Sequence, residues 1–152
     1  MLSIARILAP TDFSRHADVA VKYACGVAEK FGSELHLLHV LSETILPVGP
    51  DPSLVATMPP EFYATSEEHS RNALRDLIAP GWPRPATVKV DVRWGDPVLE
   101  VVSYSQGHHI DLIVVATHGR TGLSHALLGS VAERIIREAP CPVLTIRDRT
   151  PA

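Results

Sequence analysis

Residues 111–130, DLIVVATHGRTGLSHALLGS, carry the clearest indication of the fold class. Leu112 to Ala116 include no polar residue, which predicts a strand buried on both faces, as in a parallel sheet. Gly119, Gly122 and Gly129 follow, and without a Cβ the backbone can turn sharply or approach a ligand closely. Residues 131–138 then have helical periodicity. A loop between a buried strand and a helix N-terminus is where parallel α/β sheets bind phosphorylated ligands, so this stretch indicates a nucleotide site.

The same residues also allow an explanation that needs no ligand. Ser130 and Glu133 have the S-x-x-E spacing of a capping box, in which the serine caps the helix and the glutamate reaches back to it. The glycines would then serve only the geometry of a turn. The two interpretations are compatible, because a serine hydroxyl and N–H groups at a helix start can serve a cap or a phosphate oxygen.

Strand-like and helix-like segments alternate along the rest of the chain, which is typical of a parallel α/β sheet. Helix starts are indicated by residues 12–14 and by Asp96 followed by Pro97, and helix ends by Gly32, Gly107 and Pro140. Residues 88–94 alternate between apolar and charged, which predicts a strand near an edge of the sheet. We expect strands at 4–9, 35–41, 88–94, 112–116 and 143–146, and helices at 14–31, 61–78, 97–106 and 131–138.

The segment 42–60 does not fit this alternation. It contains five prolines and one glycine, so regular structure is not expected there. Because it follows the second strand, it should emerge at the same end of the sheet as the glycine loop. It is interpreted either as a lid over a ligand or as a variable surface excursion.

Composition narrows the class of protein. A length of 152 residues fits one domain, 1–152, and a formal charge of −3 argues against a general nucleic-acid binder. No apolar run approaches the roughly 20 residues that cross a bilayer, and the N-terminus lacks a secretion signal, so no membrane association is expected. The two cysteines, Cys25 and Cys141, fit a reducing compartment better than a disulfide framework. These features predict a cytoplasmic protein.

Several motifs together resemble the universal stress protein family. Ala116-Thr-His-Gly119, nine residues, and Gly129-Ser130 look like its nucleotide signature G-x2-G-x9-G-[ST]. The opening segment 7–14 resembles the family's first strand and turn, residues 95–97 its third helix start, and 139–144 its entry into the last strand. These motifs also occur in the family's order and at its spacing. One departure is Ala116, which occupies the position of the signature's first glycine.

The resemblance implies an open α/β fold with five parallel strands in the order 3-2-1-4-5 and helices on both faces, as in Rossmann-like proteins. It also implies binding of ATP, with or without Mg²⁺, and a homodimer built through the last strand. By resemblance, residues 9–12 and Val40 would surround adenine, and the segment 116–132 would hold the ribose and phosphates. The implied nucleotide contacts are Ala9, Pro10, Thr11, Asp12, Val40, Ala116, Thr117, His118, Gly119, Arg120, Gly122, Gly129, Ser130, Val131 and Ala132.

Three functions remain open at this point. The first is an ATP-binding stress-response module, the second is a dimeric interaction protein of the same fold without nucleotide, and the third is a slow ATP hydrolase. No G-x-x-x-x-G-K-[ST] or G-x-S-x-G motif is present, so efficient catalysis is not expected. His36 and His39 should point to opposite faces of their strand, while His108 and His109 should be exposed, and we assign no metal site to any of them.

Overall fold

A computed structural model describes residues 3–43, 46–51, 53–119 and 128–149 of the chain. Its centre is a five-stranded sheet in the order β5-β2-β1-β6-β7, and every neighbouring pair is parallel. Numbered along the chain without the separate β3–β4 pair, this is the predicted order 3-2-1-4-5. The strands of the sheet are β1 (Arg6–Pro10), β2 (Glu34–Leu41), β5 (Thr87–Trp94), β6 (Leu112–Ala116) and β7 (Val143–Ile146).

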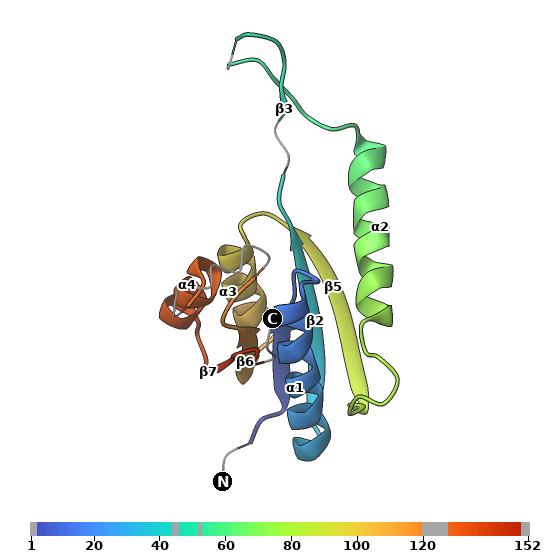
Figure 1. Cartoon of the computed structure of the whole chain (residues 1–152), viewed down its shortest axis with the longest axis vertical. Coiled ribbons are helices and arrows are strands. Elements are labelled where there is room, and N and C mark those ends of the chain that lie inside the picture. Colours follow the sequence, from blue (N-terminus) through green and yellow to red (C-terminus); the bar gives the residue numbers. More distant parts are fainter. Residues whose placement is uncertain (1–2, 44–45, 52, 120–127, 150–152) are drawn as a thin grey trace.

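Helices cover both faces of the sheet, as the sequence predicts (Figure 1). One core cluster joins α1 (Arg15–Phe31) and α2 (Pro60–Asp76) to β1, β2 and β5 through residues such as Val21 and Leu74. The other joins α3 (Pro97–Gly107) and α4 (Ser130–Glu138) to the opposite face through residues such as Val101 and Ile135. The sheet is therefore buried between two helical layers, and both β1 and β6 contribute to each cluster.

The residues predicted to begin and end helices do so in α1, and the predicted start of α3 is also found. The Ser14 side chain caps α1 by accepting from the N–H of Ala17, and Gly32 ends that helix in the left-handed region with φ 67°. The carboxylate of Asp96 accepts from the N–H groups of Val98 and Leu99 at the start of α3. These caps fix where each helix leaves the sheet.

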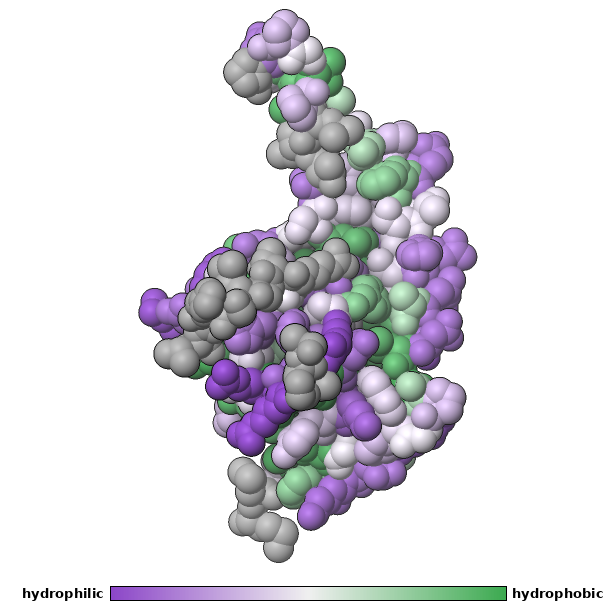
Figure 2. Space-filling view, viewed as in Figure 1, coloured by the Kyte–Doolittle hydropathy of each residue, from purple (hydrophilic) through white to green (hydrophobic). Residues whose placement is uncertain are grey.

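The segment 42–60 differs from expectation, because it contains a short antiparallel pair, β3 (Leu46–Pro47) with β4 (Val55–Ala56). The N–H of Val48 donates to the carbonyl of Leu54 at 2.8 Å. In Figure 1 the pair projects beyond the end of the sheet, and Figure 2 shows hydrophilic surface at its tip with hydrophobic surface next to it. The prolines permit this ladder because it is only two residues long on each strand.

β5 is an edge strand, as its alternating pattern predicts. Arg71 of α2 reaches over it, with one guanidinium nitrogen 3.4 Å from the carbonyl oxygen of Val90 and the other 3.7 Å from the carboxylate of Asp91. This contact covers a peptide group that would otherwise be open to pairing. Among the described residues, no helix has the length and apolar character needed to cross a membrane.

Candidate functional site

A pocket of about 300 Å³ opens at the carboxyl ends of β1, β2 and β6, beside the start of α4. Ligands of open α/β sheets bind at this position, where the strand order reverses. Ala9 is fully buried and is not part of the lining, and Arg120 and Gly122 lie outside the described residues. The other implied contacts all line the pocket: Pro10, Thr11, Asp12, Val40, Ala116, Thr117, His118, Gly119, Gly129, Ser130, Val131 and Ala132.

The inner wall of the pocket is apolar, and the sequence analysis missed it. The residues that form this apolar wall come from α1, α3 and α4 as well as from the sheet. Several of them belong to the core cluster beneath α3 and α4. Leu38 could have been found, because it lies two residues before Val40 and so on the same face of β2. The additional lining residues are Ala17, Leu38, Pro97, Val101, Val115 and Ile135.

The turn between β1 and α1 supplies the polar side of the pocket. The N–H of Phe13 donates to Oγ1 of Thr11 at 3.0 Å, and the N–H of Ser14 donates to Oδ1 of Asp12 at 2.9 Å. Phe13 has φ 60°, a left-handed conformation that residues with a Cβ adopt at a cost. The local hydrogen bonds and this backbone conformation together fix the Asp12 carboxylate beside the pocket.

The start of α4 does not form the capping box that its sequence suggests. The N-cap is Gly129 and Ser130 is the first residue of the helix; within the described ranges no side chain caps it. The carboxylate of Glu133 instead accepts from Arg137, at 2.7 Å. The first-turn N–H groups of a helix have no acceptor within it, and the first turn of α4 begins at the pocket, where Ser130 and Val131 are lining residues. The Ser130 side chain is therefore not the N-cap of α4.

Two glycines bring backbone close to other parts of the pocket. A Cβ on Gly119 would lie 2.8 Å from Oδ2 of Asp12, and a Cβ on Gly129 would lie 3.0 Å from the carbonyl oxygen of Thr117. Both distances are shorter than ordinary carbon–oxygen contacts. The glycines at 119 and 129 therefore serve close packing of the pocket wall as well as the turn.

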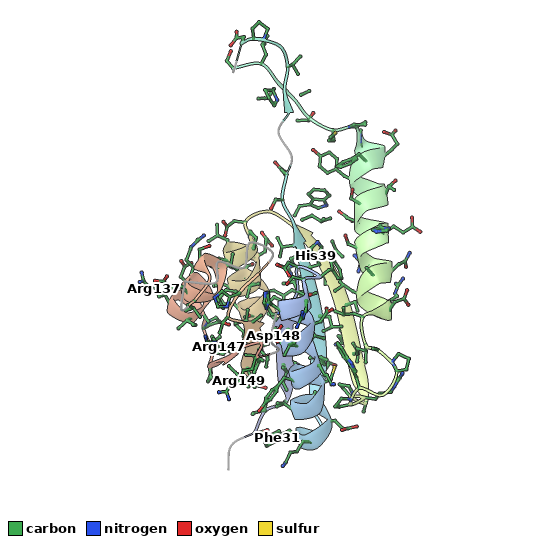
Figure 3. All side chains as sticks on the ribbon, viewed as in Figure 1. Phe31, His39, Arg137, Arg147, Asp148 and Arg149 are labelled. Atoms are coloured by element: carbon green, nitrogen blue, oxygen red, sulfur yellow. The ribbon has the colours of Figure 1, made fainter. Side chains whose placement is uncertain are left out.

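The charges near the mouth of the pocket include both signs. Burial, followed by the charge of Asp12, raises the pKa of Asp18 on α1. Asp148, labelled in Figure 3, follows β7. Its carboxylate lies 3.5 Å from Arg15 and 3.5 Å from His16. The His16 ring centroid is 6.1 Å from that of His118, so the C-terminal segment meets the start of α1 beside the pocket.

The two histidines of β2 point to opposite faces, as predicted. Nδ1 of His36 lies 2.7 Å from the Tyr104 hydroxyl and Nε2 lies 2.7 Å from the Glu34 carboxylate, on the α3 side. His39 faces the α1 side, where its ring contacts Phe13. Burial lowers the pKa of His36, against the opposing effect of Glu34. Within the described part of the chain, no group of three or more potential metal ligands is found.

The expectation that His108 is exposed is wrong, whereas His109 is exposed. The His108 ring stacks on Tyr104 with centroids 3.8 Å apart, and its Nδ1 lies 3.0 Å from the carbonyl oxygen of Tyr104. The chain turns back at the end of α3, so a residue placed after the helix still packs against its last turn.

The fold defines a Rossmann-like α/β protein with a pocket at the switch in strand order. The sequence profile of the universal stress protein family matches residues 3–147, so the chain belongs to that family. Universal stress protein MJ0531 of Methanocaldococcus jannaschii is 34% identical over 145 residues, covering 93% of this chain and 81% of the relative.

Solved structures show the same fold. Protein MJ0577 superposes with a TM-score of 0.75 at 25% identity, covering 99% of this chain and 100% of that one. A universal stress protein solved in complex with cAMP superposes with a TM-score of 0.60 at 21% identity, covering 95% of this chain and 98% of that one.

Proposed function

We propose that this chain binds an adenine nucleotide, ATP in particular, and acts as a ligand-responsive stress-response module in the cytoplasm. One observation carries the proposal: an apolar cleft, a carboxylate-bearing turn and the N-terminus of α4 meet in one pocket at the switch in strand order. The cAMP complex of a protein with the same fold supports an adenine nucleotide as the ligand class.

The pocket offers a different surface to each part of a nucleotide. Leu38 and Val40 present apolar side chains suited to a flat base, and Asp12 is an acceptor suited to hydroxyl or amino groups. The first turn of α4 with Ser130 offers hydrogen-bond donors suited to phosphate oxygens. Mg²⁺ would accompany the phosphates and neutralise part of their charge, and we assign it no protein ligand.

We further propose that residues 1–152 form one domain and that two copies pair through β7. This strand is an edge of the sheet, and all four of its residues are partly exposed. Pairing with a second copy would cover the exposed edge.

Ala116 favours a second candidate, a dimeric interaction protein of the same fold that binds no nucleotide. Ala116 lines the pocket and occupies the position where the family signature has its first glycine. The methyl group takes up space at the carboxyl end of β6, where a ligand would approach the backbone. The two candidates differ only in whether the pocket is used.

Calorimetric titration of the protein with ATP and Mg²⁺, with AMP and GTP as controls, tests the proposal. Saturable heat with ATP and AMP but weaker binding of GTP is expected. Absence of heat and of any thermal shift with all three would reject nucleotide binding and leave the interaction protein. Phosphate release that scales with protein and falls in Asp12→Asn or Ser130→Ala would add slow hydrolysis.

A further inference from the structure

His39 lies between two pocket residues of β2 but faces away from the pocket. Leu38 and Val40 line the cleft, whereas the His39 side chain enters the α1 layer, and the residue is 8% exposed. Its ring centroid is 4.6 Å from that of Phe13, in the turn that follows β1. Figure 3 labels it at the end of β2 from which the pocket opens. One strand thus contacts the cleft from one face and the supporting turn from the other.

The imidazole of His39 binds the main chain of that turn directly. Nδ1 lies 2.8 Å from the carbonyl oxygen of Thr11, and because a carbonyl can only accept, Nδ1 must carry the proton. The N–H of Thr11 donates to the carbonyl of Leu38 at 2.9 Å. Thr11 is itself buried, at 6% exposed, so its carbonyl requires a partner. Leu38 and His39, which are adjacent on β2, therefore bind the N–H and the carbonyl of Thr11 respectively.

This contact lies where the chain leaves β1. Pro10 is the last β1 residue in register with β2, and the backbone turns at Phe13 with φ 60° two residues after Thr11. A left-handed conformation at a residue with a Cβ persists when its surroundings hold it. The His39 ring contacts Phe13 and its Nδ1 binds Thr11, so it contacts the turn on both sides of Asp12.

We propose that His39 is a positioning residue of this site: by holding the Thr11 carbonyl, its imidazole directs the Asp12 carboxylate at the pocket. The effect on ligand affinity rests on the proposed nucleotide function. The effect on the turn does not, because it concerns the protein without ligand.

Three variants separate positioning from general stability. His39→Leu removes the donor, and His39→Asn keeps an N–H in nearly the same place as Nδ1. His36→Leu is the matched control, since it removes another buried histidine of β2 from the opposite face, where it contacts Tyr104 and Glu34. Both leucine variants should unfold at lower temperature, so a change in the turn in only one of them reports positioning.

The first readout is amide hydrogen exchange at Phe13 and Ser14 without ligand. Exchange should be faster in His39→Leu, near normal in His39→Asn, and normal in His36→Leu. The second readout is ATP affinity, which should fall about five- to tenfold in His39→Leu, as for the loss of a buried hydrogen bond. His39→Asn should restore most of it. If Asp12 is the residue positioned, Asp12→Asn combined with His39→Leu should cost less than the sum of the two changes.

The outcomes distinguish this proposal from the proposed function. If unchanged protein binds no nucleotide, the proposed function fails, while exchange in the turn still tests His39. Unchanged exchange in His39→Leu, or unchanged ATP affinity in a protein that binds ATP, would overturn the positioning role. The unsubstituted protein provides a test that does not depend on variants folding: imidazole nitrogen shifts must show protonated Nδ1 at His39, and an unprotonated Nδ1 would reject the proposal.

Discussion

The N–H of Gly129 donates to the carbonyl oxygen of Thr117 at 2.6 Å, which ties the start of α4 to the end of β6. Gly129 has φ −71°, a value open to any residue, so left-handed backbone does not explain the glycine. Lack of room explains it, because a Cβ at position 129 would lie 3.0 Å from the Thr117 oxygen and 3.6 Å from Cα of His118. The short contact between these two segments sets the width of the pocket rim.

Gly129→Ala should therefore move the start of α4 away from β6 and weaken ATP binding about tenfold or more, since the phosphate donors move with the helix. Calorimetry measures the affinity and thermal unfolding measures the stability. Gly107→Ala is the matched control, because a Cβ there meets nothing within 4 Å. Equal affinity for the two variants would mean that α4 does not contact the nucleotide.

Gly119→Ala tests the other side of the pocket. Its Cβ would lie 2.8 Å from Oδ2 of Asp12, so the carboxylate must move from the position where it accepts from Ser14. We expect several-fold weaker ATP binding, together with a change in the Ser14 amide resonance. A shifted resonance with full affinity would show that the ligand does not use the Asp12 carboxylate.

The sequence was sufficient for the sheet and for most of the pocket. Hydrophobic periodicity and caps such as Asp96 indicated where the helices and strands lie. The resemblance to the family motif indicated which residues form the polar wall of the pocket. The S-x-x-E spacing at Ser130 allowed a capping box, which does not form because the helix already starts from Gly129. The apolar inner wall, including Val101 and Ile135, needed the packing of α3 and α4 against the sheet, which local periodicity does not describe.

The support behind the pocket was not predictable either. A histidine at position 39 is compatible with core packing, a surface or a ligand, and only the register of β1 with β2 brings it to the Thr11 carbonyl. The same holds for His108, whose stacking on Tyr104 depends on how the chain turns after α3. Such contacts join residues from separate elements and have no local pattern.

Because the pKa of His36 is lowered in the folded protein, we expect the protein to lose stability in acid. Burial lowers its pKa from the ordinary 6.5, so below that pH the unfolded chain takes up a proton that the folded protein resists. Its contribution is present above pH 6.5 and is lost as the pH falls toward the lower folded-state pKa. In His36→Gln, the decrease in melting temperature between about pH 7.5 and pH 5.5 should be smaller. An identical decrease would place the acid sensitivity elsewhere.

The two cysteines should differ in reactivity. Cys25 is fully buried, and burial raises its pKa to about 11, so little thiolate exists at neutral pH. Cys141 is partly exposed, and burial raises its pKa as well. A disulfide reagent should label Cys141 slowly in the native protein and Cys25 only after denaturant is added. Mass spectrometry of the peptides assigns each site, and early labelling of Cys25 would contradict the buried position in α1.

The proposed dimer can be tested at the exposed edge of β7. The carbonyls of Pro142 and Ile146 accept from Ile113 on β6 and from Thr117, which follows β6, so the peptide groups of Pro142 and Ile146 point into the sheet. Because backbone direction alternates along a strand, Thr145 presents its N–H to the edge. Thr145→Pro would remove a donor to a second copy while leaving the bonds to β6 in place.

Light scattering after size exclusion should then show a dimer for the unchanged protein and a monomer for Thr145→Pro. Thr145→Val is the control, since it keeps the N–H and a β-branched side chain and should remain dimeric. A small change in melting temperature at low protein concentration would confirm that the internal ladder is intact. If Thr145→Pro remains dimeric, the two copies meet through another surface, and β7 is only the edge of the sheet.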